Sequence, residues 1–178
     1  FGVLSPHAAS FYTKTVKTRI HKPLEIHFHA DFGLAVANTI MSVLAGGEVI
    51  HSTVTGIGER AGNTPMEETI MALLTLYGID VGIKYNRMNK LASLVSELSG
   101  IPIPRNRPFI GDEAYDVESG IVVSWYKNTC DEYPTIAYPV MPKFIGHREP
   151  RIIMGKKSGL DSVAIWAERL GIELGEEE

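Results

Sequence analysis

The pattern of apolar and polar residues over the first eighty positions alternates between helix-like and strand-like segments. Apolar positions recurring at helical spacing predict helices over residues 5–19, 34–45 and 64–77. Between them, residues 24–29 and 49–54 are rich in β-branched and alternating positions and are predicted as strands. The order strand, helix, strand, helix favours parallel strands joined by right-handed crossovers, which is the pattern of an α/β fold.

The first predicted strand separates its residues cleanly into two faces. Side chains alternate along a strand, so every second residue points the same way. The apolar face holds Leu24, Ile26 and Phe28, and the polar face holds Glu25, His27 and His29. Because His27 and His29 lie about 6.6 Å apart along the chain and share a face, their imidazoles can converge on one ion.

These two histidines begin the motif H-x-H-x-D, which ends at Asp31. Imidazole and oxygen ligands together suit Zn, Mn, Fe or Co, and oxygen-rich sites also accept Mg. Catalytic metals usually take three protein ligands, and Asn63 could add an oxygen from the end of the next loop. Asp31 is a further candidate, as a ligand or as support that orients an imidazole. The alternative is that these polar residues line a solvated strand edge.

The second predicted strand leads into a glycine-rich loop over residues 56–63. Its spacing, G-x-G-x-x-x-G, misses the dinucleotide fingerprint by one residue. The loop runs into a helix start, predicted with Thr64 at the N-cap, Pro65 at N1 and Glu67 at N3, where free N–H groups favour an anion. Glu59 in this loop, next to Arg60, is the candidate catalytic residue. A tight turn with a surface ion pair is the alternative.

The pattern changes at Gly82. Helices are predicted over 88–99, near 115–126 and over 159–170, with proline-rich stretches between them. We therefore expect two regions: residues 1–81, the C-terminal part of a (β/α)8 barrel, and residues 82–178, a small, mainly helical subdomain. The second contains four basic residues that could meet a phosphate or simply form a solvated face: Arg148, Arg151, Lys156 and Lys157.

Composition and charge narrow the classes of function. The chain has 178 residues, 44% hydrophobic and 21% charged, with a net charge of -4. This charge does not favour nucleic acid as a partner, and no apolar run approaches the roughly 20 residues of a membrane span. The single cysteine, Cys130, fits a reducing cytoplasm. Because the chain opens on a strand end and a loop, we expect an N-terminal half to be missing.

Two stretches resemble a known family. Residues 27–39, which begin His27-Phe28-His29-Ala30-Asp31, and residues 56–63, Gly-Ile-Gly-Glu-Arg-Ala-Gly-Asn, resemble the 2-isopropylmalate, homocitrate and citramalate synthases. These enzymes are the acyl-CoA condensing members of the DRE-TIM metallolyase superfamily. Residues 118–121 and 155–159 resemble, more weakly, landmarks of the family's accessory subdomains.

The resemblance implies a (β/α)8 TIM barrel in which this chain supplies the end of strand six through helix eight, followed by an accessory subdomain. It implies that His27 and His29 coordinate a divalent metal (Mn, Mg, Zn or Co), with Asn63 in or near its ligand shell and Asp31 as support. It further implies a 2-oxo acid and acetyl-CoA as substrates, their condensation as the reaction, and a homodimer.

Differences from the family pattern leave alternatives to the synthase function open. The family's first-strand aspartate and arginine are absent from these residues, and Val122 stands where a catalytic-type histidine is usual. A carbon–carbon lyase of the same superfamily and a non-catalytic, degenerate barrel partner are the other two hypotheses. A reactive cysteine marks one lyase branch, but the corresponding loop here reads Glu59-Arg60-Ala61. An unpaired sheet edge favours assembly, so we expect a homo-oligomer or a complementary N-terminal half as partner.

Overall fold

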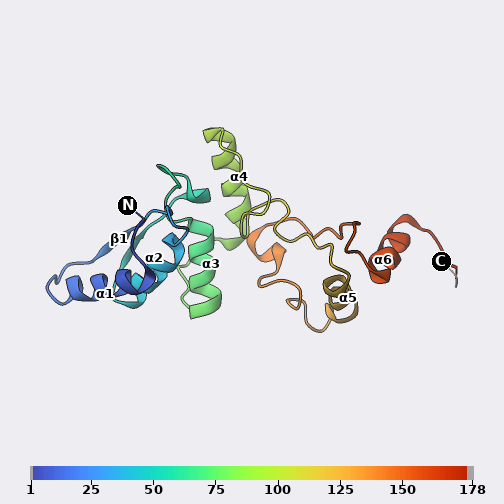
Figure 1. Ribbon diagram of the computed structural model, residues 1–178, viewed down its shortest axis with the longest axis horizontal. Coiled ribbons are helices and arrows are strands. Elements are labelled where there is room, and N and C mark those ends of the chain that lie inside the picture. Colours follow the sequence, from blue (N-terminus) through green and yellow to red (C-terminus); the bar gives the residue numbers. More distant parts are fainter. Residues whose placement is uncertain (1, 176–178) are drawn as a thin grey trace. The chain divides into compact units, whose positions relative to one another are not determined.

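The computed structural model describes residues 2–175, and its chain divides into two compact units (Figure 1). Unit 1 comprises Phe1–Lys84 and Lys90–Ile103, and unit 2 comprises Tyr85–Asn89 and Pro104–Glu178. The chain therefore enters unit 2 briefly, returns to unit 1 and enters unit 2 again. Each unit is described by itself.

Unit 1 is an α/β arrangement. Its strands β1 (Glu25–His27) and β2 (Val49–His51) pair in parallel, with Ile26 opposite Ile50 and His27 opposite His51. The prediction of parallel strands joined through a helix is confirmed. The other elements are helices: α1 (Pro6–Lys17), α2 (Ala35–Leu44), the 3-10 turn η1 (Val54–Gly56), α3 (Met66–Tyr77) and α4 (Met88–Ser99), whose first two residues belong to unit 2.

Helices α1 and α2 pack closely because their contact surfaces carry small residues. Ala9 and Thr13 of α1 are buried, as is Ser42 of α2, and the hydroxyls of Thr13 and Ser42 are 2.9 Å apart. Next to them, α2 packs on α3 (Figure 1). Met71 and Leu73 of α3 are almost fully buried. Small polar side chains that bond to each other allow this close approach without leaving buried groups unpaired.

The predicted start of α3 is wrong by one residue. The N-cap is Pro65 and has no side-chain capping bond, whereas Thr64 is fully buried with its hydroxyl 3.1 Å from that of Thr39. Glu67 does not reach back to the N-cap either: its carboxylate accepts from the Thr55 N–H at 3.0 and 3.1 Å. Burial of Thr64 against α2 removes its side chain from the helix end, so tertiary packing overrides the local capping signal.

In its described residues, unit 2 has the helices α5 and α6, joined by long irregular segments. Its elements are η2 (Tyr85–Arg87), α5 (Gly120–Thr129), η3 (Pro142–Ile145) and α6 (Leu160–Leu170). The helix predicted near 115–126 begins later, because residue 117 pairs with Ile152 in a parallel bridge and is therefore extended. Lys127 of α5 and Asp161 of α6 form an ion pair at 2.8 Å.

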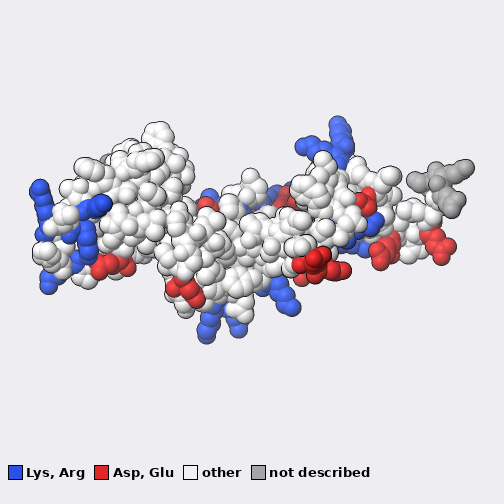
Figure 2. Space-filling view, turned by 90° about the horizontal axis from the view of Figure 1, so that it is seen from below, with Lys and Arg blue, Asp and Glu red and all other residues white. Residues whose placement is uncertain are grey.

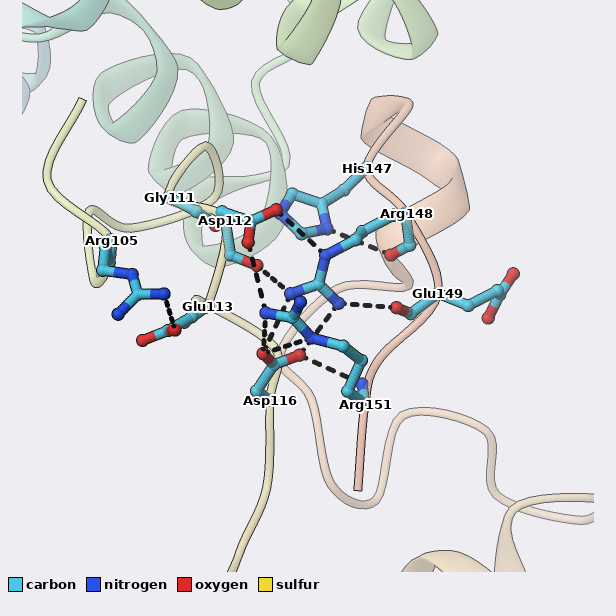
Figure 3. A network of polar contacts seen from close by, with 9 residues as sticks. All are labelled: Arg105, Gly111, Asp112, Glu113, Asp116, His147, Arg148, Glu149 and Arg151. Carbon is cyan, nitrogen blue, oxygen red and sulfur yellow. Dashed lines mark hydrogen bonds and ion pairs between the residues drawn. The ribbon is translucent and has the colours of Figure 1, made fainter. Parts of the chain in front are cut away.

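An ion-pair network organises the segments between these helices (Figure 3). Asp116 has a side chain only 6% exposed and accepts from Arg148 and Arg151 at 2.7–3.0 Å. Asp112 pairs with the same two arginines at 3.0 and 3.2 Å. Burial would raise the pKa of Asp116, but the hydrogen bonds from the two arginines outweigh it and lower the pKa to about 2. Two of the four predicted basic residues are thus held by carboxylates.

The surface of unit 1 carries large apolar side chains alongside charged ones. Basic residues gather near the end of α1 and the loop after it (Figure 2), which contain Lys14, Lys17, Arg19 and Lys22. Phe11 on α1 and Leu76 on α3 are each about three-quarters exposed, at 74% and 75%. Over the described residues, no helix is long and apolar enough to cross a membrane.

Candidate metal centre

The two histidines of the first motif converge at the carboxyl end of β1. Ile26 is buried while its neighbours Glu25 and His27 are exposed, so the alternation predicted from the sequence is confirmed for this strand. The Nε2 atoms of His27 and His29 lie 3.2 Å apart. Two imidazole nitrogens bonded to one ion at about 2.0–2.1 Å are separated by roughly 3.0–3.4 Å, depending on the coordination angle. The pair therefore has the spacing of two ligands of a single metal.

Asn63 lies beside this pair. Residues 29 and 63 form an antiparallel bridge, and the Oδ1 atom of Asn63 is buried with no hydrogen-bond partner in the described part of the chain. The same holds for Nδ1 of His29. Gly58 makes this arrangement possible, since a Cβ there would stand 2.4 Å from Asn63 Oδ1. Two imidazoles and an unpartnered amide oxygen are neutral donors of the kind that divalent metals accept, so these residues fit such an ion.

One neighbour of the pair was missed in the sequence. His51 lies in the second predicted strand, and the parallel register places its ring 5.6 Å from that of His27. Its Nε2 atom is 2.8 Å from the carboxylate of Glu25. Burial and the nearby imidazoles of His29 and His51 lower the pKa of His27. Both histidines lie in strands predicted to be parallel, but only the observed register places them opposite each other.

Among the described residues, the carboxylate of Asp31 pairs with an arginine and a backbone amide and not with an imidazole. Its carboxylate accepts from Arg60 Nε at 2.7 Å and Nη2 at 3.1 Å, and from the Gly2 N–H at 3.0 Å. The hydrogen bonds from Arg60 and Gly2 hold the pKa of Asp31 well below its usual range. A bidentate arginine is a stronger partner than a neutral imidazole, so the carboxylate joins the two motif loops instead.

The glycine-rich loop is held in an unusual backbone conformation. Thr55 and Arg60 have φ of 63° and 57°, values that residues with a side chain seldom adopt. The carbonyl of Gly62 accepts from the Ala30 N–H at 3.0 Å, which adds a second link between the loops. Glu59, the candidate catalytic residue, has a side chain 86% exposed and lies 3.8 Å from Arg60. Its carboxylate is therefore accessible to solutes.

The described residues do not contain a complete set of strong ligands. Among residues 2–175, no group of three His, Cys, Asp or Glu side chains could hold a metal ion. Val122, at the position where a histidine is usual in the resembling family, lies in α5 of unit 2. The three ligands predicted from the sequence, His27, His29 and Asn63, all lie in unit 1.

Comparison with known proteins decides the family. A model of the HMGL-like family matches residues 1–95, more than half of the chain and the whole of the region that carries both motifs. The chain belongs to the HMGL-like family. The predicted membership of the DRE-TIM metallolyase superfamily is thereby confirmed.

Curated HMGL-like relatives that match this chain carry synthase names. Homocitrate synthase AksA of Methanopyrus kandleri is 42% identical over 176 residues, covering 99% of this chain and 43% of that protein. (R)-citramalate synthase CimA and 2-isopropylmalate synthase of Methanocaldococcus jannaschii are 38% and 35% identical over 99% of this chain, and 35% and 33% of their own lengths are covered. The chain thus spans about a third to two-fifths of these relatives.

Solved structures support the fold of this HMGL-like chain. The HMG-CoA lyase of Bacillus subtilis superimposes with a TM-score of 0.51 and 23% identity, over 58% of this chain and 37% of the lyase. A second HMG-CoA lyase, from Acinetobacter baumannii, gives a TM-score of 0.52 at 22% identity, over 58% of this chain and 36% of the lyase. At these identities the likeness concerns the fold alone, which is that of HMG-CoA lyase-like TIM-barrel proteins.

Proposed function

We propose that this chain is part of a metal-dependent synthase that condenses acetyl-CoA with a 2-oxo acid. The observation that carries the proposal is the 3.2 Å separation of the His27 and His29 Nε2 atoms at the end of a parallel strand. The synthase names of relatives 35–42% identical over nearly the whole chain support the reaction class.

The residues of unit 1 have distinct roles in this proposal. His27 and His29 would hold the metal through Nε2, and Asn63 would add its unpartnered Oδ1 to the same ligand shell. When bound, a divalent ion supplies Lewis-acid stabilisation of the negative charge that develops on the ketone oxygen of the 2-oxo acid. Asp31 and Arg60 hold the two loops together, and this fixes the position of Asn63 relative to the histidines.

Glu59 is the proposed proton-transfer residue of this chain. Its exposed carboxylate extends from the loop that also carries Asn63. A carboxylate at such a position can accept a proton from the acetyl methyl group or return one to the product oxygen. The guanidinium of the neighbouring Arg60 lies 3.8 Å from this carboxylate.

We also propose how the chain fits into the complete enzyme. Residues 1–81 would form the C-terminal part of the barrel, from the end of strand six to helix eight, and residues 82–178 an accessory subdomain. The exposed apolar side chains on α1 and α3 are what a surface covered by further barrel elements or a second subunit requires. The remaining metal ligands would come from those further barrel elements, from the second subunit or from the substrate.

The sole cysteine argues against the lyase branch that uses a reactive thiol. Cys130 is the C-cap residue of α5 in unit 2, whereas the loop after β2 contains none. We therefore place the synthase reaction ahead of carbon–carbon cleavage.

Calorimetric titration of the chain with Mn²⁺ and Zn²⁺ tests the metal centre. We expect one ion per chain, and a loss of affinity of at least about 100-fold in His27→Ala and in His29→Ala, because each removes a direct ligand. His21→Ala is the matched control, since His21 lies exposed in the loop before β1. Equal affinity in all four proteins would contradict the site.

The reaction is tested by thiol release from acetyl-CoA in the complete protein that contains this chain. With Mn²⁺ or Mg²⁺ present, pyruvate, 2-oxoisovalerate and 2-oxoglutarate are compared as acceptors. We expect one of them to release free CoA and Glu59→Gln to reduce the rate by about 100-fold, the usual scale for general acid–base catalysis. Firm metal binding with no thiol release from any acceptor would favour the non-catalytic hypothesis.

A further inference from the structure

Unit 2 contains a cavity of about 370 Å³ that the proposed reaction does not use. Three arginines line it, Arg105, Arg151 and Arg169, against a single carboxylate, that of Glu113. They come from three separate segments of the chain, before the Asp112–Asp116 turn, after the η3 segment and at the end of α6. Arg105 is paired with Glu113, and Arg151 with Asp112 and Asp116 outside the lining, so Arg169 supplies the uncompensated positive charge. A concave site with this charge and with further guanidinium donors is suited to an anion.

The arginines of this cavity retain unused hydrogen-bond donors. Arg169 makes no hydrogen bond or ion pair within the described chain, and its guanidinium lies over the Trp166 ring, 5.8 Å from the ring centre. Arg105 binds Glu113 through Nη2 at 2.8 Å, and its other nitrogens have no partner among residues 2–175. Arg151 binds the two aspartates through Nε and Nη2, which leaves Nη1. Each guanidinium can therefore still donate to a ligand.

The rest of the cavity wall is apolar and partly rigid. Trp166 donates from Nε1 to the carbonyl of Ile152 at 2.9 Å, so its indole ring is fixed in orientation. Ile153 and Met154 also line the cavity and are 39% and 47% exposed. An indole and two apolar side chains beside a cluster of guanidinium groups suit a ligand with a flat ring and a phosphate.

We propose that this cavity binds a phosphorylated adenosine, with the phosphate at the three arginines and the base against the apolar wall. A phosphate dianion satisfies several guanidinium groups at once, whereas a single carboxylate usually pairs with one. The volume, about 370 Å³, is within the range of sites for ligands of this size. The choice of adenosine rests on the proposed function, because acetyl-CoA carries a 3′-phosphorylated adenosine.

Calorimetric titration of the chain with adenosine 3′,5′-bisphosphate tests this site. We expect saturable, salt-sensitive binding that is weakened about tenfold in Arg169→Gln and in Arg105→Gln, since each removes one charge-assisted contact. Arg87→Gln is the matched control, because Arg87 is an exposed arginine of unit 2 that does not line the cavity. Unchanged affinity in both cavity variants would overturn the proposal.

A substitution that removes a negative charge from the cavity, and should therefore strengthen binding, sharpens the test. Glu113 holds Arg105 and adds a negative charge to the cavity, so Glu113→Gln should bind the bisphosphate several-fold more tightly. A simple loss of folding could not produce tighter binding. Weaker binding in Glu113→Gln would contradict the anion site.

Comparison of ligands distinguishes the source of the phosphate. CoA and the bisphosphate binding more tightly than ATP would assign the site to the acyl-CoA, and equal binding of ATP would assign it to free adenine nucleotides. Inorganic phosphate or a dicarboxylate such as malate binding as tightly as the bisphosphate would overturn the proposal. Because metal binding at His27 and His29 is measured separately, failure here leaves the proposed function intact.

Discussion

The two units of this chain hold their charged groups in different ways. In unit 1, the proposed metal-site residues come from two short stretches, 27–31 and 59–63. The first begins at the last residue of β1, the second follows β2, and Asp31 and Arg60 join them. In unit 2, Asp116 meets Arg148 and Arg151, more than thirty residues away, with no regular sheet between them. Both arrangements join segments about thirty residues apart, but in unit 1 the pairing of β1 with β2 brings the segments together, whereas in unit 2 side-chain ion pairs connect them.

This difference predicts that neutralising Asp116 has the largest effect on stability. Asp116→Asn leaves two arginines short of a buried carboxylate and should destabilise unit 2 by about 3 kcal/mol. Both tryptophans, Trp125 and Trp166, are in unit 2, so their fluorescence during urea unfolding reports on that unit. Asp131→Asn, in the same unit but outside the network, is the control. An unchanged midpoint in Asp116→Asn would show that the network contributes little.

A backbone substitution should have the largest effect in unit 1. Gly62 has φ of 93°, and a Cβ there would stand 2.1 Å from the Gly56 carbonyl oxygen. We expect Gly62→Ala to destabilise unit 1 by about 2–3 kcal/mol and to weaken metal binding, because the loop carries Asn63. Gly78→Ala is the control, since it also has positive φ but nothing within 4 Å. Equal losses in the two variants, by circular dichroism, would exclude the contact as the cause.

Lowering the pH should destabilise unit 2 through protonation of Asp116. The pKa of Asp116 is lowered to about 2, so its ionised form stabilises the folded state above the unfolded pKa near 4. That contribution, about 2 kcal/mol, is lost as the pH falls from about 4 to about 2. Tryptophan fluorescence in urea should therefore show a falling midpoint over this range, and the fall should be absent in Asp116→Asn. A parallel fall in that variant would assign the effect to other carboxylates.

The smallest effect is expected from the ion pair of unit 1. Asp31 and Arg60 are partly exposed to solvent, so Asp31→Asn should lower the stability of unit 1 only slightly. Its measurable consequence is lower metal affinity, because one link between the two loops is removed. Glu48→Gln, which breaks the exposed pair with Lys17, is the matched control and should leave metal affinity unchanged. Equal metal affinity in Asp31→Asn and the original chain would show that backbone contacts alone hold the loops.

The sequence predicted the elements of unit 1 well because their signals are local. The helix at α1, the strand at β1 and the helix at α4 follow from periodicity, and the convergence of His27 and His29 follows from strand alternation. Three features could not be predicted from local sequence. Thr64 is buried against Thr39 and does not cap α3. Asp31 is bound by Arg60. His51 contacts His27 only because of the register of the two strands.

In unit 2 the local signals were weaker. The cluster containing Arg148 and Arg151 left two alternatives open, a phosphate site and a solvated face. Two aspartates distant in sequence hold these arginines, so neither alternative describes the pair fully. Only the folded arrangement showed that Arg151 also lines a cavity with Arg105 and Arg169.

The path of the chain between the units has a practical consequence for dissecting the protein. Tyr85–Asn89 belongs to unit 2, Lys90–Ile103 returns to unit 1, and α4 continues across that change without a break. No single cut in the chain therefore yields both units whole: truncation after residue 84 removes part of unit 1, and truncation after residue 103 leaves five residues of unit 2 behind. A protease that cuts once in this region would separate the units only by removing residues from one of them.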